Sequence, residues 1–257
     1  MGALEFDDVV FGYGGSLLFD GFSASFPTGS ISCIVGPNGC GKSTLAKLAM
    51  GMVKPTSGRV RVAGRDVSSL AARDRARLLG VLVQQQEAPM MTARELVACG
   101  RFPSCGSFSR LSRTDGERID EALLLAGVSE LRDRSLRSLS GGQRQRVRMA
   151  MVLAQDTPIV LLDEPTSFMD VAACFDMVRL IRQVRQRGKT VVAVIHDLNL
   201  ALSVADQVFV MERGRLAAQG EPADSCVRAA IEQSFGVRLE HVQTGCGTAW
   251  VPFESRE

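Results

Sequence analysis

Aromatic residues, histidines and paired cysteines are scarce in this sequence. Only 5% of the 257 residues are aromatic, with one tryptophan and one tyrosine, and only two residues are histidines. The seven cysteines are scattered along the chain, and no two of them form a Cys-x-x-Cys pair. This pattern argues against a zinc site and against a disulfide framework, and it favours reduced thiols in the cytosol.

Net charge is small and long hydrophobic runs are absent. The 30 basic and 28 acidic residues leave a net charge of +2, so bulk electrostatic binding of nucleic acid is not expected. No apolar run reaches the roughly 18 residues of a membrane-spanning helix. The start, Met1 to Glu5, has an acid where a signal peptide needs bases and then an apolar run. We therefore expect a soluble chain whose membrane role depends on a partner.

Hydrophobic patterning predicts an α/β fold whose strand-rich core is interrupted by a helical insertion. Alternating runs near the N-terminus are typical of antiparallel strands, whereas later, wholly apolar runs are typical of buried parallel strands. Helical periodicity dominates between Gln84 and Asp156. The expected strands are 4–11, 23–26, 31–35, 59–62, 79–83, 159–162, 191–195, 208–211, 237–242 and 248–253. The expected helices are 42–50, 92–100, 115–126 and 143–155, with a loop over 101–113 and one short helical stretch in the tail 223–257.

A complete phosphate loop follows the expected strand 31–35. It reads Gly36-Pro37-Asn38-Gly39-Cys40-Gly41-Lys42-Ser43 and opens the helix that begins near Lys42. Its glycines allow backbone N–H groups to curl around phosphates, Lys42 can reach the β and γ phosphates, and the Ser43 hydroxyl can ligate Mg²⁺. The placement between a strand and a helix makes a glycine-rich turn that binds nothing a poor alternative.

A second anion cradle lies about a hundred residues later. The segment Leu139-Ser140-Gly141-Gly142-Gln143 places a serine and two glycines at the start of a long helical pattern. Such a helix N-terminus is open to close approach by an anion. One nucleotide does not need two such cradles in one chain, so the pair predicts two chains sharing two nucleotides.

Two acids and a histidine follow apolar strands of the same expected sheet. Asp163 and Glu164 end the strand 159–162, and His196 follows the strand 191–195. Ligands of open α/β sheets bind at the carboxyl ends of the strands. We expect Asp163 to hold Mg²⁺ through water, Glu164 to act as general base toward the attacking water, and His196 to lie near the γ-phosphate.

Two further residues are candidates for the nucleotide site. Gln84 closes the strand 79–83 and opens the helical insertion, so its amide could ligate Mg²⁺ when the insertion moves inward. Because Gln85 and Gln86 follow, this assignment could be displaced by one residue. Tyr13 lies in a glycine-containing turn before the phosphate loop and could stack on a nucleobase. Filling the core or covering the surface is an equally plausible role for Tyr13.

Together these residues resemble the ATP-binding subunit of ABC transporters over nearly the whole chain. The resemblance implies a P-loop NTPase (RecA-like) core with an antiparallel β subdomain and an inserted α-helical subdomain. It implies a homodimer that binds two ATP molecules with Mg²⁺, each between the Walker A of one chain and the signature of the other. The motifs occur in the family's order: aromatic loop at Tyr13, Walker A at 36–44 including Thr44, Q-loop at Gln84, signature at 139–143, Walker B at 159–164, D-loop at Asp170 and switch histidine at His196.

The resemblance also implies a domain plan and partners. Residues 1–257 would form one ABC ATPase domain, with a nucleotide-binding core of 1–84 and 158–222. Residues 85–157 would form the helical subdomain with the signature, and 223–257 a C-terminal extension. Two transmembrane permease subunits, served by an extracytoplasmic substrate-binding protein, would bind the chain at the cytoplasmic face of the inner membrane. No nucleic-acid partner is expected.

Finer resemblance indicates an importer. Segments 91–101, 149–157 and 196–199 are similar to the ATPases of ferric-siderophore, haem and cobalamin uptake systems. We predict uptake of iron complexes, ferric siderophores foremost, with haem or cobalamin as the alternative. A soluble ABC-type ATPase acting on ribosomes or DNA is the alternative of another class. Two departures from the family pattern are Phe168-Met169 in the D-loop, where Ala-Leu is usual, and Val83, where proline is common.

Overall fold

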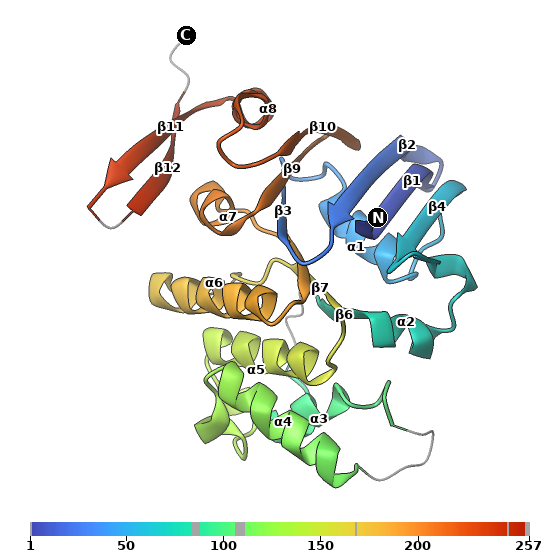
Figure 1. The fold of residues 1–257 in the computed structure, drawn as a ribbon, viewed down its shortest axis with the longest axis vertical. Helices are drawn as coiled ribbons and strands as arrows, with labels where there is room; N and C mark the ends of the chain where they lie inside the picture. The colour runs from blue at the N-terminus through green and yellow to red at the C-terminus, as the bar shows by residue number, and fades with distance from the viewer. Residues whose placement is uncertain (1, 84–87, 106–110, 168, 246, 255–257) are drawn as a thin grey trace.

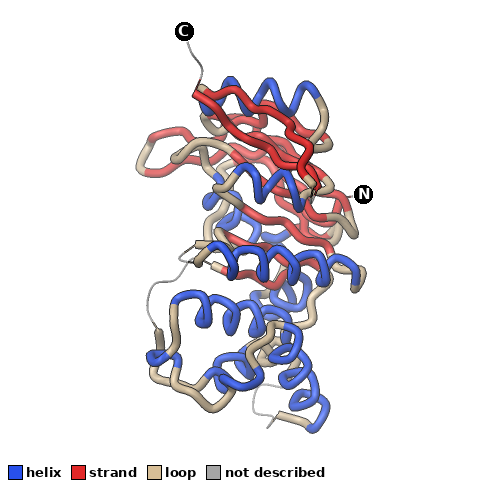
Figure 2. The backbone as a smooth tube through the Cα atoms, turned by 90° about the vertical axis from the view of Figure 1, so that its left-hand side faces the viewer, coloured by secondary structure: helices blue, strands red, loops and turns tan. Residues whose placement is uncertain are grey.

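The computed structural model describes the chain except for residues 1, 84–87, 106–110, 168, 246 and 255–257. The three sheets of the described residues lie in the upper part of the molecule in Figure 1, and a group of helices lies below them. Figure 2, turned by a quarter, shows the same separation of a strand-rich part from a helical part. This arrangement matches the expected core with a helical insertion.

The central sheet is six-stranded and mostly parallel. Its strand order is β10-β9-β3-β8-β7-β6, in which β10 alone runs antiparallel to its neighbour. The strands β3, β7 and β8 are buried along their whole length, as their apolar sequences predict. The bounds are β3 Ile31–Val35, β6 Leu79–Leu82, β7 Ile159–Asp163, β8 Thr190–Val194, β9 Gln207–Glu212 and β10 Arg215–Gly220.

Alternate residues of the central sheet face two different layers. On one face, Ile34 and its neighbours pack against helix α1 (Lys42–Ala49) and the antiparallel sheet. On the other face, Cys33 and its neighbours pack against α6 (Val171–Gln186) and α7 (Leu198–Val204). Because successive side chains of a strand point to opposite faces, one apolar run serves both layers.

The antiparallel sheet covers α1 from outside. Its order is β2-β1-β4-β5, and its inner face is rich in phenylalanines, with Phe6 and Phe22 in edge-to-face contact at 5.8 Å between ring centroids. Figure 1 shows α1 between this sheet and β3. The bounds are β1 Gly2–Tyr13, β2 Ser16–Pro27, β4 Ser57–Val62 and β5 Arg65–Asp66.

The helical part consists of α3 (Ala93–Cys99), α4 (Arg113–Leu125) and α5 (Gly141–Ala154). Each begins with a capping box, in which an N-cap hydroxyl and an acid or amide three residues later satisfy each other's backbone N–H groups. Two of these caps correct the predicted helix starts. The helix expected from Asp115 begins at Arg113, and the helix expected from Gln143 begins at Gly141, because Ser112 and Ser140 are the N-caps.

Several elements were not predicted. The helix α2 (Ala72–Leu78) contains no buried residue, so it has no apolar stripe to reveal it.

The tail forms α8 (Ser225–Phe235) and a hairpin of β11 (Val237–Thr244) and β12 (Gly247–Glu254), as expected. Short 3₁₀ turns occur at η1 Val67–Ser69, η2 Ser129–Leu131 and η3 Leu136–Ser138. Within the described ranges, no helix is both long and apolar enough to cross a membrane.

The helix α4 offers a matched test of this core. Leu123 is 1% exposed and its neighbour Leu124 is 72% exposed. Leu123→Ala should lower the free energy of unfolding by about 2–5 kcal/mol because it leaves a cavity in the core. Leu124→Ala should change it by no more than about 0.5 kcal/mol. Urea unfolding followed by circular dichroism measures both, and equal losses would show that the wrong face of α4 is buried.

Candidate functional site

The phosphate loop joins the end of β3 to the start of α1. Gly39 and Gly41 have φ values of +81° and +111°, in the region that favours glycine. A Cβ on Gly41 would lie 2.6 Å from the ring of Phe19, which is fully buried. Gly41 is the N-cap of α1 and makes no side-chain cap bond, so the first N–H groups of this helix remain directed at the loop. The loop is therefore a backbone cradle for an anion.

Lys42 brings a positive charge to this cradle. Its residue is 6% exposed, and its Nζ donates hydrogen bonds to the carbonyl oxygens of Gly36 at 2.7 Å and Pro37 at 2.9 Å. The Cys40 sulfur lies 3.8 Å from the same nitrogen. Burial raises the pKa of the Cys40 thiol, although the Lys42 charge opposes this. The thiol thus remains neutral beside the ammonium.

Ser43 and Asp163, 120 positions apart in the sequence, bring two oxygen ligands together. The Ser43 hydroxyl donates to Asp163 Oδ1 at 3.5 Å. Burial, and then the charge of Glu164, raises the pKa of Asp163, so a cation there would stabilise the ionised carboxylate. A hydroxyl and one carboxylate fit Mg²⁺, which keeps several waters and few protein ligands. Among the described residues, no group of three or more His, Cys, Asp or Glu could hold a metal.

Glu164 and His196 meet at the carboxyl edge of the sheet. His196 Nε2 and Glu164 Oε1 are 2.6 Å apart, and the Ser167 hydroxyl donates to Glu164 Oε2 at 2.8 Å. Burial alone would raise the pKa of Glu164, but the hydrogen bonds from His196 and Ser167 outweigh it and lower the pKa. Glu164 is therefore ionised at neutral pH and able to accept a proton.

The backbone at Glu164 is strained. Its φ of +54° is in the left-handed region, which is uncommon for residues other than glycine. The Glu164 N–H is held by the carbonyl of Val194 at 3.1 Å, at the end of the neighbouring strand β8. The strained residue is thus tied to β8, the strand that His196 follows, and its carboxylate contacts His196.

Tyr13 lies beside α1 rather than in the core. Its side chain is 47% exposed, its ring meets Phe11 edge to face, and Lys47 Nζ is 5.9 Å from its ring centroid. Lys47 is on α1, just after the phosphate loop. An exposed aromatic ring is thus available near the phosphate loop, which favours base stacking over core filling.

The second cradle is fully formed on α5. The N–H of Gln143 donates to Ser140 Oγ at 3.2 Å, and the N–H of Ser140 donates to Gln143 Oε1 at 3.0 Å. Ser140 is exposed, and the first N–H groups of α5, at Gly141 and Gly142, have no acceptor within the helix. The helix α5 packs against α3 and α4, whereas α1 packs against β4 and β7. The two cradles are therefore mounted on different layers.

The remaining expected residues have different outcomes. Asp170 is exposed and is the N-cap of α6, where its Oδ1 accepts the Ala173 N–H at 2.8 Å. Gly142 lies near this segment, since a Cβ there would be 3.6 Å from Ala173 Cβ. Gln84 lies outside the described residues. Asn38 and Gly39 are exposed in the loop, and Thr44 is buried on α1.

Sequence reasoning missed two side chains at this edge. The Ser167 hydroxyl donates to the proposed base Glu164. Its position three residues after Glu164 is the only feature of the sequence that could have indicated this contact. Asn199 binds the distant Trp250 backbone, and no local signal indicates this contact.

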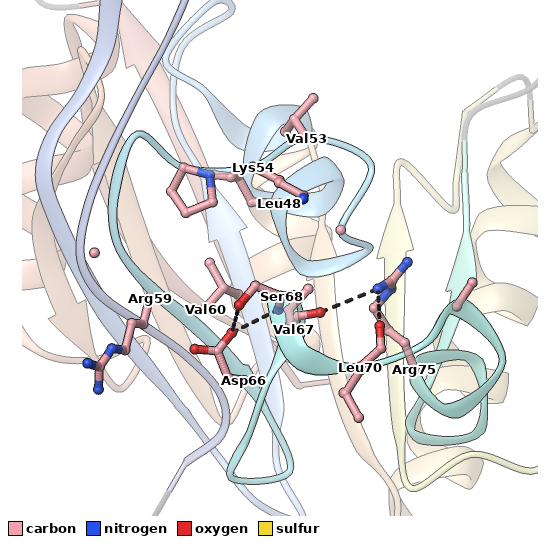
Figure 3. A pocket seen from close by; sticks show the side chains of 14 residues that line it. Leu48, Val53, Lys54, Arg59, Val60, Asp66, Val67, Ser68, Leu70 and Arg75 are labelled. Atoms are coloured by element: carbon pink, nitrogen blue, oxygen red, sulfur yellow. Dashed lines mark hydrogen bonds between the residues drawn. The ribbon is translucent and has the colours of Figure 1, made fainter.

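A separate cavity of about 310 Å³ lies between the end of α1, β4 and α2. Figure 3 shows that Asp66 accepts bonds from Ser68, while Arg75 donates to the carbonyls of Val67 and Leu70. These partners are structural, so this cavity contains none of the chemistry described above.

A phosphate loop, paired acids at a strand end and a histidine on the adjacent strand are typical of a P-loop nucleotide hydrolase. The family model described as ABC transporter matches residues 19–167, more than half of the chain. The chain belongs to this family and is an ATP-binding, ATP-hydrolysing subunit that powers transport. The predicted family and fold class are thereby confirmed.

Curated relatives cover nearly the whole chain. The ferric enterobactin transport ATP-binding protein FepC of Escherichia coli (strain K12) is 38% identical over 91% of this chain and 88% of its own length. The iron(3+)-hydroxamate import ATP-binding protein FhuC of Bacillus subtilis (strain 168) is 35% identical over 94% and 91%. The hemin import ATP-binding protein HmuV of Rhodopseudomonas palustris (strain HaA2) is 37% identical over 97% and 96%.

Solved structures agree on the fold. A chain of an inward-facing transporter assigned to the metal-chelate ABC type has a TM-score of 0.85 and 26% identity, with 98% of each chain covered. The ATP-binding cassette MJ0796, solved as a dimer in a post-hydrolysis state with ADP and Pi, has a TM-score of 0.76 and 26% identity, covering 86% of this chain and 99% of that one.

The phosphate loop can be tested at Gly41. Gly41→Ala forces a side chain into a left-handed φ against the Phe19 ring, and such strain costs about 1–3 kcal/mol. We expect ATP affinity to fall about tenfold or more. Gly116→Ala is the control, because Gly116 is on α4 and a Cβ there meets nothing within 4 Å. Calorimetric titration with ATP measures both, and unchanged affinity in Gly41→Ala would refute the cradle.

Proposed function

We propose that this chain is the ATP-hydrolysing subunit of an importer for iron complexes, in particular ferric siderophores, acting through a separate permease. The observation that carries the ATPase chemistry is the 2.6 Å contact between Glu164 and His196, at the same sheet edge as Lys42 and the Ser43–Asp163 pair. The relatives named for ferric enterobactin and iron(3+)-hydroxamate transport support the substrate class.

Each residue of the edge has a role in this proposal. The phosphate loop, residues 36–44, binds the phosphates through its N–H groups and Lys42. Glu164, ionised and held by Ser167 and His196, accepts the proton of the attacking water. Ser43, Asp163 and Gln84 would hold Mg²⁺, which when bound would neutralise negative charge on the phosphates. His196 orients the Glu164 carboxylate and lies toward the γ-phosphate.

The signature segment Ser140 to Gln143 serves the nucleotide of a second copy. Its cradle is exposed and preformed, and it is mounted on the helical layer rather than beside its own phosphate loop. Asp170, exposed at the start of α6 near Gly142, would contribute to the same interface. The dimer of the cassette MJ0796 with ADP and Pi supports a homodimer, in which two ATP molecules would be shared.

The helical part would transmit the closing and reopening of the dimer, driven by ATP binding and hydrolysis, to two permease subunits. Three large apolar side chains near its start are exposed, Met90 at 81%, Phe102 at 63% and Leu111 at 40%. Exposed apolar surface of this kind favours a protein partner. Arg73 and Arg77 of α2 both donate to the Pro103 carbonyl, at 3.0 and 2.8 Å, and so connect this face to the core.

The subunit would lie at the cytoplasmic face of the inner membrane, with an extracytoplasmic protein delivering substrate to the permease. In this proposal residues 1–84 and 158–222 form the nucleotide-binding core, 85–157 the helical subdomain and 223–257 the extension.

The catalytic role of Glu164 can be tested by replacing its carboxylate with an amide. Glu164→Gln keeps the size of the side chain and one of its two acceptor oxygens but loses the base, so turnover should fall about 100-fold or more. ATP binding should remain, and the unhydrolysed nucleotide should keep two chains together. Steady-state ATPase assays and analytical ultracentrifugation measure these effects. Glu117→Gln, in an exposed ion pair with Arg113, is the control. Normal turnover in Glu164→Gln would assign the base elsewhere.

The substrate class can be tested in proteoliposomes containing the permease with which this chain co-purifies. With ATP inside and binding protein outside, we expect uptake of a radiolabelled ferric siderophore, and none with Glu164→Gln. Haem is the competing substrate, because the hemin relative covers 97% of this chain. Uptake of haem alone would replace the siderophore proposal and leave the ATPase proposal intact.

A further inference from the structure

The C-terminal hairpin is attached to the segment that carries His196. The backbone N–H of Trp250, on β12, donates to Asn199 Oδ1 at 2.9 Å. Asn199 lies in the first turn of α7, three residues after His196, and β12 packs along α7. Trp250 and Asn199, 51 positions apart in the sequence, are thus joined beside the sheet edge that carries Glu164 and His196, here called the catalytic edge.

The hairpin is itself rigidly held. Trp250 is 7% exposed and Leu239 is 2% exposed, and both belong to the main core. The N–H of Leu239 donates to Glu232 Oε1 on α8 at 2.8 Å, and the His241 ring packs on Trp250 with 4.3 Å between centroids and a tilt of 34°. Asn199 Oδ1 therefore accepts its bond from Trp250, a residue that is packed into the core.

The His196 side chain is less firmly held than the backbone on either side of it. Its side chain is 44% exposed and borders an open groove of about 590 Å³ between the His196 segment and the hairpin. The ring contacts Glu164 through one nitrogen. The backbone before His196 is held by the Ile195 N–H, which donates to the Ile34 carbonyl at 3.4 Å. After His196, the first turn of α7 is held by Asp197, whose Oδ1 accepts the Leu200 N–H at 3.0 Å, and by the bond from Trp250 to Asn199. Loss of the bond to Trp250 would let this turn shift, and His196 with it.

We propose that Asn199 is a positioning residue for the ATPase reaction, and that the hairpin β11–β12 sets the geometry of the His196–Glu164 pair through it. This inference rests on the proposed role of His196 at the γ-phosphate. The C-terminal extension would thus contribute to the rate of ATP hydrolysis.

Two substitutions of the same residue test the proposal. Asn199→Ala removes the acceptor for the Trp250 N–H, whereas Asn199→Asp keeps an acceptor oxygen at the same place. Ser203→Ala is the matched control, because it removes a hydrogen bond within α7, from Ser203 to the Leu200 carbonyl, and leaves the bond from Trp250 to Asn199 in place. The measurements are kcat and KM for ATP, and ATP affinity of the monomer. Thermal unfolding checks that each variant folds.

Asn199→Ala should lower kcat about tenfold, because a displaced His196 would lose about one hydrogen bond's worth of transition-state stabilisation. KM and monomer affinity should stay unchanged, since the phosphate loop is untouched. Asn199→Asp should recover most of the turnover, and Ser203→Ala should match the wild type. Wild-type kcat in Asn199→Ala, an equal loss in Asn199→Asp, or an equal loss in Ser203→Ala would each overturn the proposal.

The two histidines of the sequence add a readout of geometry. In ¹⁵N spectra of the imidazoles, Asn199→Ala should shift the His196 Nε2 signal and Asn199→Asp should restore it, while His241 reports whether the hairpin stays packed. An unchanged His196 signal in Asn199→Ala would contradict the proposal. His196→Ala separates the two proposals: if that variant hydrolyses ATP normally, the role of His196 itself fails, and the positioning role fails with it.

Discussion

The structure depends on the parallel alignment of β3, β8 and β7. Because β8 pairs with both neighbours in the same direction, their carboxyl ends meet at one edge. Two backbone bonds continue the pairing past the strands, from Ile195 to Ile34 and from Glu164 to Val194. These bonds place the phosphate loop, the two acids and His196 together, and the second one holds Glu164 in its strained conformation. Strain of this kind persists only where the surroundings fix it.

The second constraint is the separation of the two anion cradles. One is fixed to the central sheet through α1, and the other to the helical layer through α5. Both are preformed, the first by glycines with positive φ and the second by a capping box. Preformed cradles on separate layers suit a clamp, in which nucleotide binding brings two chains together and hydrolysis releases them. The hairpin β11–β12, bonded to Asn199 three residues after His196, adds a support for the His196 segment.

Much of this could be predicted from the sequence, for physical reasons. Every parallel strand was located to within one or two residues, because strands buried on both faces require continuous apolar runs. The residues of the phosphate loop and the signature follow from glycine spacing. The helix α2 was missed because Arg73, Arg75 and Arg77 leave no apolar stripe. Gly141 and Gly142 were left out of α5 because isolated glycines disfavour helix, a preference that the Ser140 cap overrides.

Other features could not have been predicted. The left-handed backbone of Glu164 depends on the neighbouring strand, and the bond from Trp250 to Asn199 joins residues far apart in the sequence. Short-range patterns contain no information on either. The tail strands were predicted, but their attachment to the catalytic edge needed the three-dimensional fold.

The central claim is that one active site is built from two chains, and mixing two inactive variants tests it most directly. Lys42→Ala disables the phosphate loop and leaves the signature intact, and Ser140→Arg does the reverse. The mixture contains dimers with one intact composite site, assembled from the loop of one chain and the signature of the other. The account predicts ATP hydrolysis in the mixture and almost none in either variant alone. A mixture as inactive as its components would contradict it.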